Sequence, residues 1–185
     1  STSDSLNFVL QHDLLITNLA RTHRMRKALI QALLMWEYRQ YNVLDPVADG
    51  LVLSYHENGV GLTKDSSTGP GQIFAKTSIE ARNFCIQQQI ITGPTKDPFN
   101  DSDLYQEWRK LYLDDIHNIT TIPLVVIKAA SDIFQPRPTL WYSQDQTRGV
   151  LARYNGTNDS ALRYGQHVGF VYNVFEKYNT TLRAR

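Results

Sequence analysis

The chain has 185 residues, of which 42% are hydrophobic and 20% are charged, and its formal net charge at pH 7 is +1. This size and composition predict a single globular domain over residues 1–185 with one apolar core. Such a balanced charge lacks the positive excess of nucleic-acid-binding proteins, so we expect no DNA or RNA partner. No apolar run approaches the ~20 residues that cross a bilayer and no signal-peptide pattern opens the chain, so we expect no membrane insertion.

Apolar residues recur at helical spacing through most of the chain. Residues 5–20 carry a loose helical rhythm, and residues 22–41 carry a stronger one. Pro46 then marks a turn or a new helix start, and residues 50–55 read as a short strand or as the continuation of that helix. Pro123 suits the first turn of a later helix. Further helical segments are predicted over residues 78–89, 101–116, 124–134, 145–156 and 160–178.

A stretch of small residues and glycines lies at residues 65–74, from Asp65 to Phe74. Such a composition lets the backbone approach a ligand closely. Directly after it, Thr77 and Glu80 have the spacing of a capping box, which predicts the start of a helix. The stretch is therefore predicted to be a tight loop that leads into a helix.

Glu37 is an acidic residue on an apolar helical face. Leu33 and Leu34 precede it by four and three residues, so its carboxyl group projects among hydrophobic side chains. Loss of hydration there should raise its pKa and let it serve as a general acid near neutral pH. The alternative is an ordinary helix-end glutamate that pairs with a nearby base such as Arg39.

Three motifs occur in an order that resembles a known superfamily. A helix ends with Glu37, a Ser-x-Gly-x-x-Gln-Ile loop follows at 67–73, and Ala-Arg-Tyr-Asn-Gly at 152–156 precedes a long helix. This order resembles lytic transglycosylases and goose-type lysozymes, over roughly residues 25–178. The resemblance implies a mainly helical, α+β lysozyme-like fold. It predicts seven or eight helices around one core, with at most a small β-ribbon near residues 51–74.

The resemblance also implies a catalytic acid. Glu37 would protonate the glycosidic oxygen of a bound glycan. It lies 35 residues before Gln72, more than is usual in the family, whereas Glu57 lies 15 residues before Gln72 and remains the alternative acid. Hydrolysis with inversion needs a second carboxylate as base, for which Asp65 and Asp49 are the candidates. Capping of a turn is the alternative role for each.

Sugar binding is the role that the same resemblance implies for the remaining motif residues. Tyr154 and Asn155 correspond to the Tyr-Asn of the family, in which the tyrosine lies close to the catalytic acid. Asn155 could equally end a helix as a left-handed cap. Trp141 is the best candidate for stacking against a sugar face. Ser67, Gly71 and Gln72 would hydrogen-bond an N-acetyl group or a sugar hydroxyl.

Neither a metal nor another cofactor is expected. The five histidines show no pair at metal-ligand spacing, and no phosphate-binding loop motif occurs. Cys85 is the only cysteine, so it cannot form an intrachain disulfide, and we expect it to be a small buried apolar residue. We interpret the Asn-x-Ser/Thr sequons as chance matches in a bacterial or phage chain. They begin at Asn118, Asn155, Asn158 and Asn179.

Together the resemblance and Glu37 predict a muramidase that acts on the glycan strands of peptidoglycan. Two alternatives stay open: a lytic transglycosylase that forms 1,6-anhydro ends, and an inactive glycan-binding domain. The protein would be secreted or delivered to the periplasm or cell wall, and we expect the targeting signal to lie outside this chain. The resemblance extends to antibacterial effector domains, which would add an immunity protein as a partner.

Overall fold

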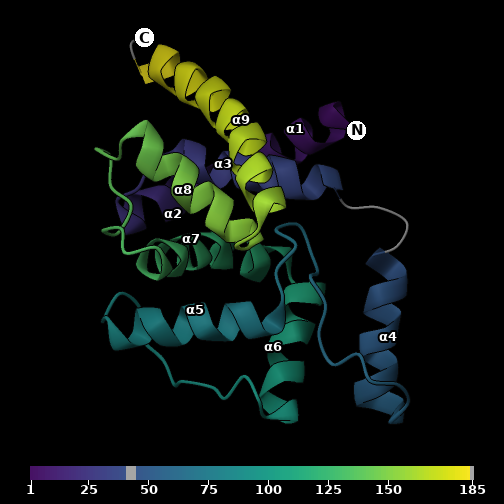
Figure 1. The fold of residues 1–185 in the computed structure, drawn as a ribbon. Helices are drawn as coiled ribbons and strands as arrows, with labels where there is room; N and C mark the ends of the chain where they lie inside the picture. Colours follow the sequence, from purple (N-terminus) through teal and green to yellow (C-terminus); the bar gives the residue numbers. More distant parts are fainter. Residues whose placement is uncertain (41–44, 184–185) are drawn as a thin grey trace. The chain divides into compact units, whose positions relative to one another are not determined.

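The computed structural model describes residues 1–40 and 45–183 (Figure 1). These residues form nine α-helices and no strand, and Thr68 and Ile73 make an isolated antiparallel bridge. The prediction of a mainly helical fold is confirmed. The helices are α1 Thr2–Gln11, α2 Asp13–His23, α3 Lys27–Gln40, α4 Asp45–Asn58, α5 Ala75–Gln87, α6 Asp101–Leu113, α7 Asp115–Asp132, α8 Gln144–Asn155 and α9 Asp159–Arg183.

The contacts divide the chain into two compact units. Unit 1 comprises Ser1–Arg39 and Val126–Arg185, and unit 2 comprises Gln40–Val125. Lys and Arg are concentrated in unit 1 and Asp and Glu in unit 2, so the two units have formal charges of opposite sign. The expectation of one domain over residues 1–185 stays a prediction.

The core of unit 1 is built on α3. Every side chain from Ala28 to Leu34 is buried, and a helix that is apolar on all sides belongs in the interior. The pair α8 and α9 packs closely because Gly165 has no side chain. A Cβ atom there would lie 2.8 Å from the Cβ of Ala152 and 3.0 Å from the carbonyl oxygen of Arg148. Gly165 therefore determines how near these two helices come.

The core of unit 2 is built on α6 and the first half of α7. Trp108 and Leu111 of α6 are fully buried, as are Ile119 and Ile122 of α7. The indole N–H of Trp108 donates to the hydroxyl of Ser66, 3.0 Å away, so the loop before α5 is attached to this core.

Several predicted boundaries differ from the structure. The segment at 5–20 forms two helices that meet at His12, which raises the helix count above the seven or eight expected. Residues 50–55 belong to α4, so the strand reading is wrong. Pro123 lies inside α7 and not at its start, because α7 already begins at Asp115. Asp114 sets that start, since its carboxylate accepts the backbone N–H of His117 at 3.1 Å.

Candidate functional site

Glu37 lies in the last turn of α3, and its side chain is buried. Only 8% of the residue is exposed. The hydroxyl of Tyr164, on α9, donates a hydrogen bond to its Oε1. Tyr154, in the last turn of α8, lies near enough for the charge of Glu37 to act on its pKa. One carboxyl group and two tyrosines from three helices of unit 1 thus form a cluster in which Glu37 and Tyr164 are buried and Tyr154 is half-buried.

The pKa of Glu37 is raised to about 7. Burial is the main cause, because it penalises the charged form, and the hydrogen bond from Tyr164 acts in the opposite direction. Burial and the nearby Glu37 charge raise the pKa values of Tyr154 and Tyr164 well above 10, so both phenols keep their protons. Near neutral pH, Glu37 is therefore the group of this cluster that gains and loses a proton.

Local sequence explains much of this cluster. The apolar face of α3 carries Glu37 inward, as its spacing from Leu33 and Leu34 predicts. Tyr164 precedes Gly165, the residue at the close contact with α8. The Tyr-Asn motif in the sequence predicts Tyr154, whereas no motif predicts Tyr164. The four-residue spacing of Tyr164 from other buried positions of α9 indicates a core face, yet nothing local indicates its partner.

Asn155 is the last residue of α8, and it is exposed. The helix ends on Gly156, whose φ of 140° suits glycine, and the Gly156 N–H donates to the carbonyl of Arg153 at 3.1 Å. The residue after Asn155 thus provides the unusual backbone conformation at this end. The sugar-binding role of Asn155 stays a prediction.

Trp141 lies in the loop between α7 and α8 of unit 1, and 89% of the residue is exposed. The carbonyl of the preceding residue, Leu140, accepts a hydrogen bond at 2.7 Å from Arg26, the residue directly before α3. Glu37 is near the other end of that helix, roughly 15 Å away at 1.5 Å per residue. Trp141 therefore does not lie beside Glu37.

The glycines of the 65–74 loop approach other parts of unit 2. Gly69 has a φ of 70°, and a Cβ there would be 2.2 Å from Nδ2 of Asn118 and 2.5 Å from the carbonyl oxygen of Leu111. The Gly71 N–H donates to Oδ1 of Asn118 at 2.7 Å, and Nδ2 of Asn118 donates to the carbonyl of Thr68 at 2.9 Å. Asn118, whose sequence context predicts only a sequon, is fully buried and holds the loop in shape.

The side chain of Gln72 folds back on its own loop. Its Nε2 donates to the carbonyl of Gly69 at 3.0 Å, and its Oε1 accepts from the hydroxyl of Ser67 at 3.3 Å. Gln72 is half-buried and has a φ of 50°. These bonds give the loop residues a structural role, and substrate binding by Ser67, Gly71 and Gln72 stays a prediction.

Asp65 caps α5. Its two carboxylate oxygens accept the backbone N–H groups of Ala75 and Lys76, each at 2.9 Å. The predicted capping box of Thr77 and Glu80 is wrong, because α5 begins at Ala75 and the cap comes from a residue ten positions earlier. Burial raises the pKa of Asp65, and hydrogen bonds from backbone amides oppose that rise.

Asp49 and Glu57 lie on α4. Asp49 is buried and accepts a hydrogen bond from Ser66 at 3.1 Å; burial raises its pKa, and hydroxyl hydrogen bonds oppose that rise. Glu57 is exposed and accepts a hydrogen bond from the hydroxyl of Tyr105, so it lacks the apolar surroundings of Glu37.

A second buried glutamate, Glu107 on α6, was not singled out from the sequence. One of its oxygens contacts Nε2 of His117 and the hydroxyl of Ser78, each at 2.7 Å, and the guanidinium of Arg82 at 3.4 Å. Burial would raise its pKa. The hydrogen bonds and the charges of His117 and Arg82 outweigh that effect and lower the pKa to about 2.

Comparison with protein-family models, curated proteins and solved structures finds no match to this chain. Within the described residues, no group of three or more His, Cys, Asp or Glu side chains could hold a metal ion. None of the described helices is long and apolar enough to cross a membrane. Glu37 and Tyr154 belong to unit 1, whereas the 65–74 loop belongs to unit 2.

Proposed function

We propose that this chain is a peptidoglycan-degrading glycosidase that cleaves the β-1,4 bond between N-acetylmuramic acid and N-acetylglucosamine. The observation that carries the proposal is Glu37, a buried carboxyl group whose pKa is raised to about 7. A general acid works best when its pKa lies near the working pH. Tyr154, the tyrosine of the Tyr-Asn motif, lies near this acid, as the resemblance implies.

In this proposal Glu37 acts first. Protonated Glu37 gives its proton to the glycosidic oxygen while the bond from that oxygen to the anomeric carbon breaks. Positive charge develops on the sugar, and Glu37 is left as a carboxylate. The hydroxyl of Tyr164 already donates to that carboxyl group, so it stabilises the charge that forms.

Two reactions can complete the cleavage. In hydrolysis, water attacks the anomeric carbon and loses a proton to a second carboxylate, for which Asp49 and Asp65 are the candidates. In lytic transglycosylation, the 6-hydroxyl of the sugar attacks the anomeric carbon, its proton passes to the Glu37 carboxylate, and a 1,6-anhydro end forms. Asp49 is already hydrogen-bonded to Ser66, and Asp65 to the start of α5. Lytic transglycosylation, which needs no second carboxylate, is therefore the alternative to hydrolysis.

The place of action follows from this substrate. Peptidoglycan lies outside the cytoplasmic membrane, so we propose that the protein acts in the periplasm or cell wall after secretion or delivery. An antibacterial effector with an immunity protein as partner is the corresponding biological role.

The test is lysis of purified cell walls by wild type, Glu37→Gln and Glu57→Gln. We expect Glu37→Gln to lose activity while it still binds peptidoglycan, and Glu57→Gln, the matched control for the rival acid, to retain activity. The reverse pattern would assign the role of general acid to Glu57. A wild-type protein that binds walls without any cleavage is a glycan-binding domain, and the proposal then fails. Mass spectrometry of the released fragments separates reducing ends from 1,6-anhydro ends.

A further inference from the structure

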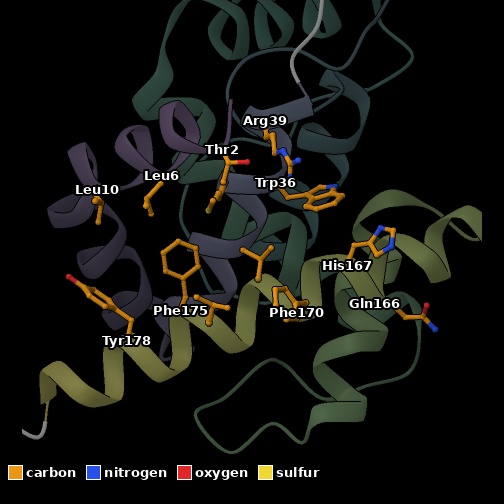
Figure 2. A pocket seen from close by; sticks show the side chains of 13 residues that line it. Thr2, Leu6, Leu10, Trp36, Arg39, Gln166, His167, Phe170, Phe175 and Tyr178 are labelled. Carbon is orange, nitrogen blue, oxygen red and sulfur yellow. The ribbon is translucent and has the colours of Figure 1, made fainter.

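An apolar groove of about 840 Å³ lies within unit 1 (Figure 2). Side chains of α1, α3 and α9 form its walls. Its volume falls in the range of about 300–1,000 Å³ that small-molecule sites occupy. Among the residues that line it are Leu6, Leu10, Trp36, Phe170, Val174 and Tyr178.

Several apolar side chains of this groove are open to solvent. Phe170, Val174 and Tyr178 follow one another at four-residue spacing on α9, and Phe170 is 71% exposed. Leu6 and Leu10 of α1 repeat the same spacing and are also exposed. Contiguous exposed apolar surface marks interaction sites in soluble proteins, whereas single exposed side chains do not. The groove therefore has the character of a binding site.

One end of the groove carries a positive charge. Among the described residues that line the groove, Arg39 is the only Lys, Arg, Asp or Glu, and its guanidinium lies 5.8 Å from the centre of the Trp36 ring. The His167 ring lies 5.7 Å from the same indole. No carboxylate of the described residues pairs with Arg39. Figure 2 shows Trp36, Arg39 and His167 toward one end, with Leu10 and Tyr178 toward the other.

We propose that this groove binds a single-chain anionic amphiphile, with the head group at Arg39 and the hydrocarbon chain along α9. A hydrocarbon chain leaves no polar group unpaired against apolar walls. The positive formal charge of unit 1 attracts an anionic head group. A second copy of the chain fits less well, because a stable dimer needs about 800 Å² of contact on each partner and the groove involves only part of three helices.

Binding is measured with three ligands of equal chain length, dodecanoate, dodecanol and dodecylammonium, with the two ionic ligands below their micelle concentrations and dodecanol below its solubility limit. Displacement of a fluorescent fatty acid reports the affinity, and no enzyme activity is needed. We expect dodecanoate to bind tightest and dodecylammonium weakest. Arg39→Gln should weaken dodecanoate roughly tenfold, the loss expected for one charged hydrogen bond, and leave dodecanol unchanged.

Two further variants locate the site on α9. Val174→Asp should abolish binding of dodecanoate and of dodecanol, because it places a charge in the apolar length of the groove. Leu162→Asp is the matched control: Leu162 is on the same helix and 62% exposed, but it does not line the groove, so binding should persist. Both positions are exposed, and circular dichroism checks that the variants stay folded.

Several results would overturn this assignment. The first is equal affinity of the wild type for dodecanoate and dodecanol, with no effect of Arg39→Gln. The second is absence of binding by the wild type. The third is binding by Val174→Asp that equals binding by the wild type. Sedimentation velocity tests the other candidate occupant, a second copy of the chain. A wild-type dimer that Val174→Asp converts to monomer would assign the groove to self-association and refute the amphiphile. Each outcome is independent of whether the protein cleaves peptidoglycan.

Discussion

Two glutamates, one in each unit, are buried to a similar degree and yet differ by about five pH units in acidity. Glu37 is 8% exposed and has a pKa of about 7, whereas Glu107 is 2% exposed and has a pKa of about 2. Burial alone would raise both values. The difference shows that the partners of a buried carboxyl group decide whether it holds a proton.

The partners are of different kinds. Glu107 contacts His117, Ser78 and Arg82, so its negative charge is surrounded by donors and by positive charge. Glu37 receives one hydrogen bond from a neutral hydroxyl, that of Tyr164. A paired, ionised carboxylate stabilises its surroundings, while a carboxyl group without a cation remains available for proton transfer. We therefore interpret Glu107 as structural, and Glu37 remains the acid of the proposed glycosidase.

The largest expected effect concerns activity. Glu37→Gln should reduce cleavage of purified peptidoglycan by about 10²–10⁴-fold, the usual contribution of a general acid. Glu107→Gln should leave the activity of the folded fraction nearly unchanged. Turbidity loss per mole of folded protein measures both. Equal losses of activity in the two variants would show that the difference in pKa between the two glutamates does not identify the catalytic acid.

The next effect concerns the stability of unit 2. The folded-state pKa of Glu107 lies below its ordinary value of 4.5, so its stabilisation is complete above pH 4.5 and is lost as the pH falls toward 2. Glu107→Gln should lower the free energy of unfolding by about 3 kcal/mol at pH 7 and by less at pH 3. Urea titration measures this.

The control for that prediction is Glu80→Gln on α5. Glu80 is exposed and lies 3.9 Å from Lys76, so its removal should change the free energy of unfolding by under about 0.5 kcal/mol. A Glu107→Gln protein as stable as the control at pH 7 would contradict the structural role of Glu107.

The contribution of Glu37 to the free energy of unfolding should depend on pH in the opposite sense to that of Glu107. Its folded-state pKa lies above the ordinary value of 4.5, so its favourable contribution is complete below pH 4.5 and is lost as the pH rises through 7. Glutamine cannot ionise and escapes that loss. Relative to wild type, Glu37→Gln should therefore gain about 3 kcal/mol of unfolding free energy between pH 4 and pH 8. Urea titrations at the two pH values test this, and a pH-independent difference would refute it.

The smallest effect concerns the pH profile. Tyr164→Phe removes the hydrogen bond that holds the pKa of Glu37 down, so the acid should stay protonated to higher pH. The alkaline limb of the activity profile should move upward by about one pH unit, the equivalent of one hydrogen bond. Tyr142→Phe removes a hydroxyl bound to the carbonyl of Pro136 and serves as the control. A downward shift would show that Tyr164 does not stabilise the carboxylate.

The periodicity of apolar residues in the sequence was sufficient to predict the helical class and the burial of Glu37. The spacing of Glu37 from Leu33 and Leu34 specifies one face of a helix, and local geometry carries that information. The chemistry of the 65–74 loop was less predictable. Its glycines suggested a ligand, but Gly69 and Gly71 make room for Asn118, which is 47 residues beyond Gly71 in the chain.

The sequence by itself determined the helical class and which carboxyl group faces inward, because both follow from the spacing of apolar residues within a few positions along the chain. Only the tertiary structure decided the partners. Tyr164 reaches Glu37 across 127 positions, and Asp65 caps α5 from ten positions away. Such pairs form when packing brings distant segments together, and no spacing along the chain encodes them. Since these partners set the acidity of a buried carboxyl group, its chemistry depends on the fold.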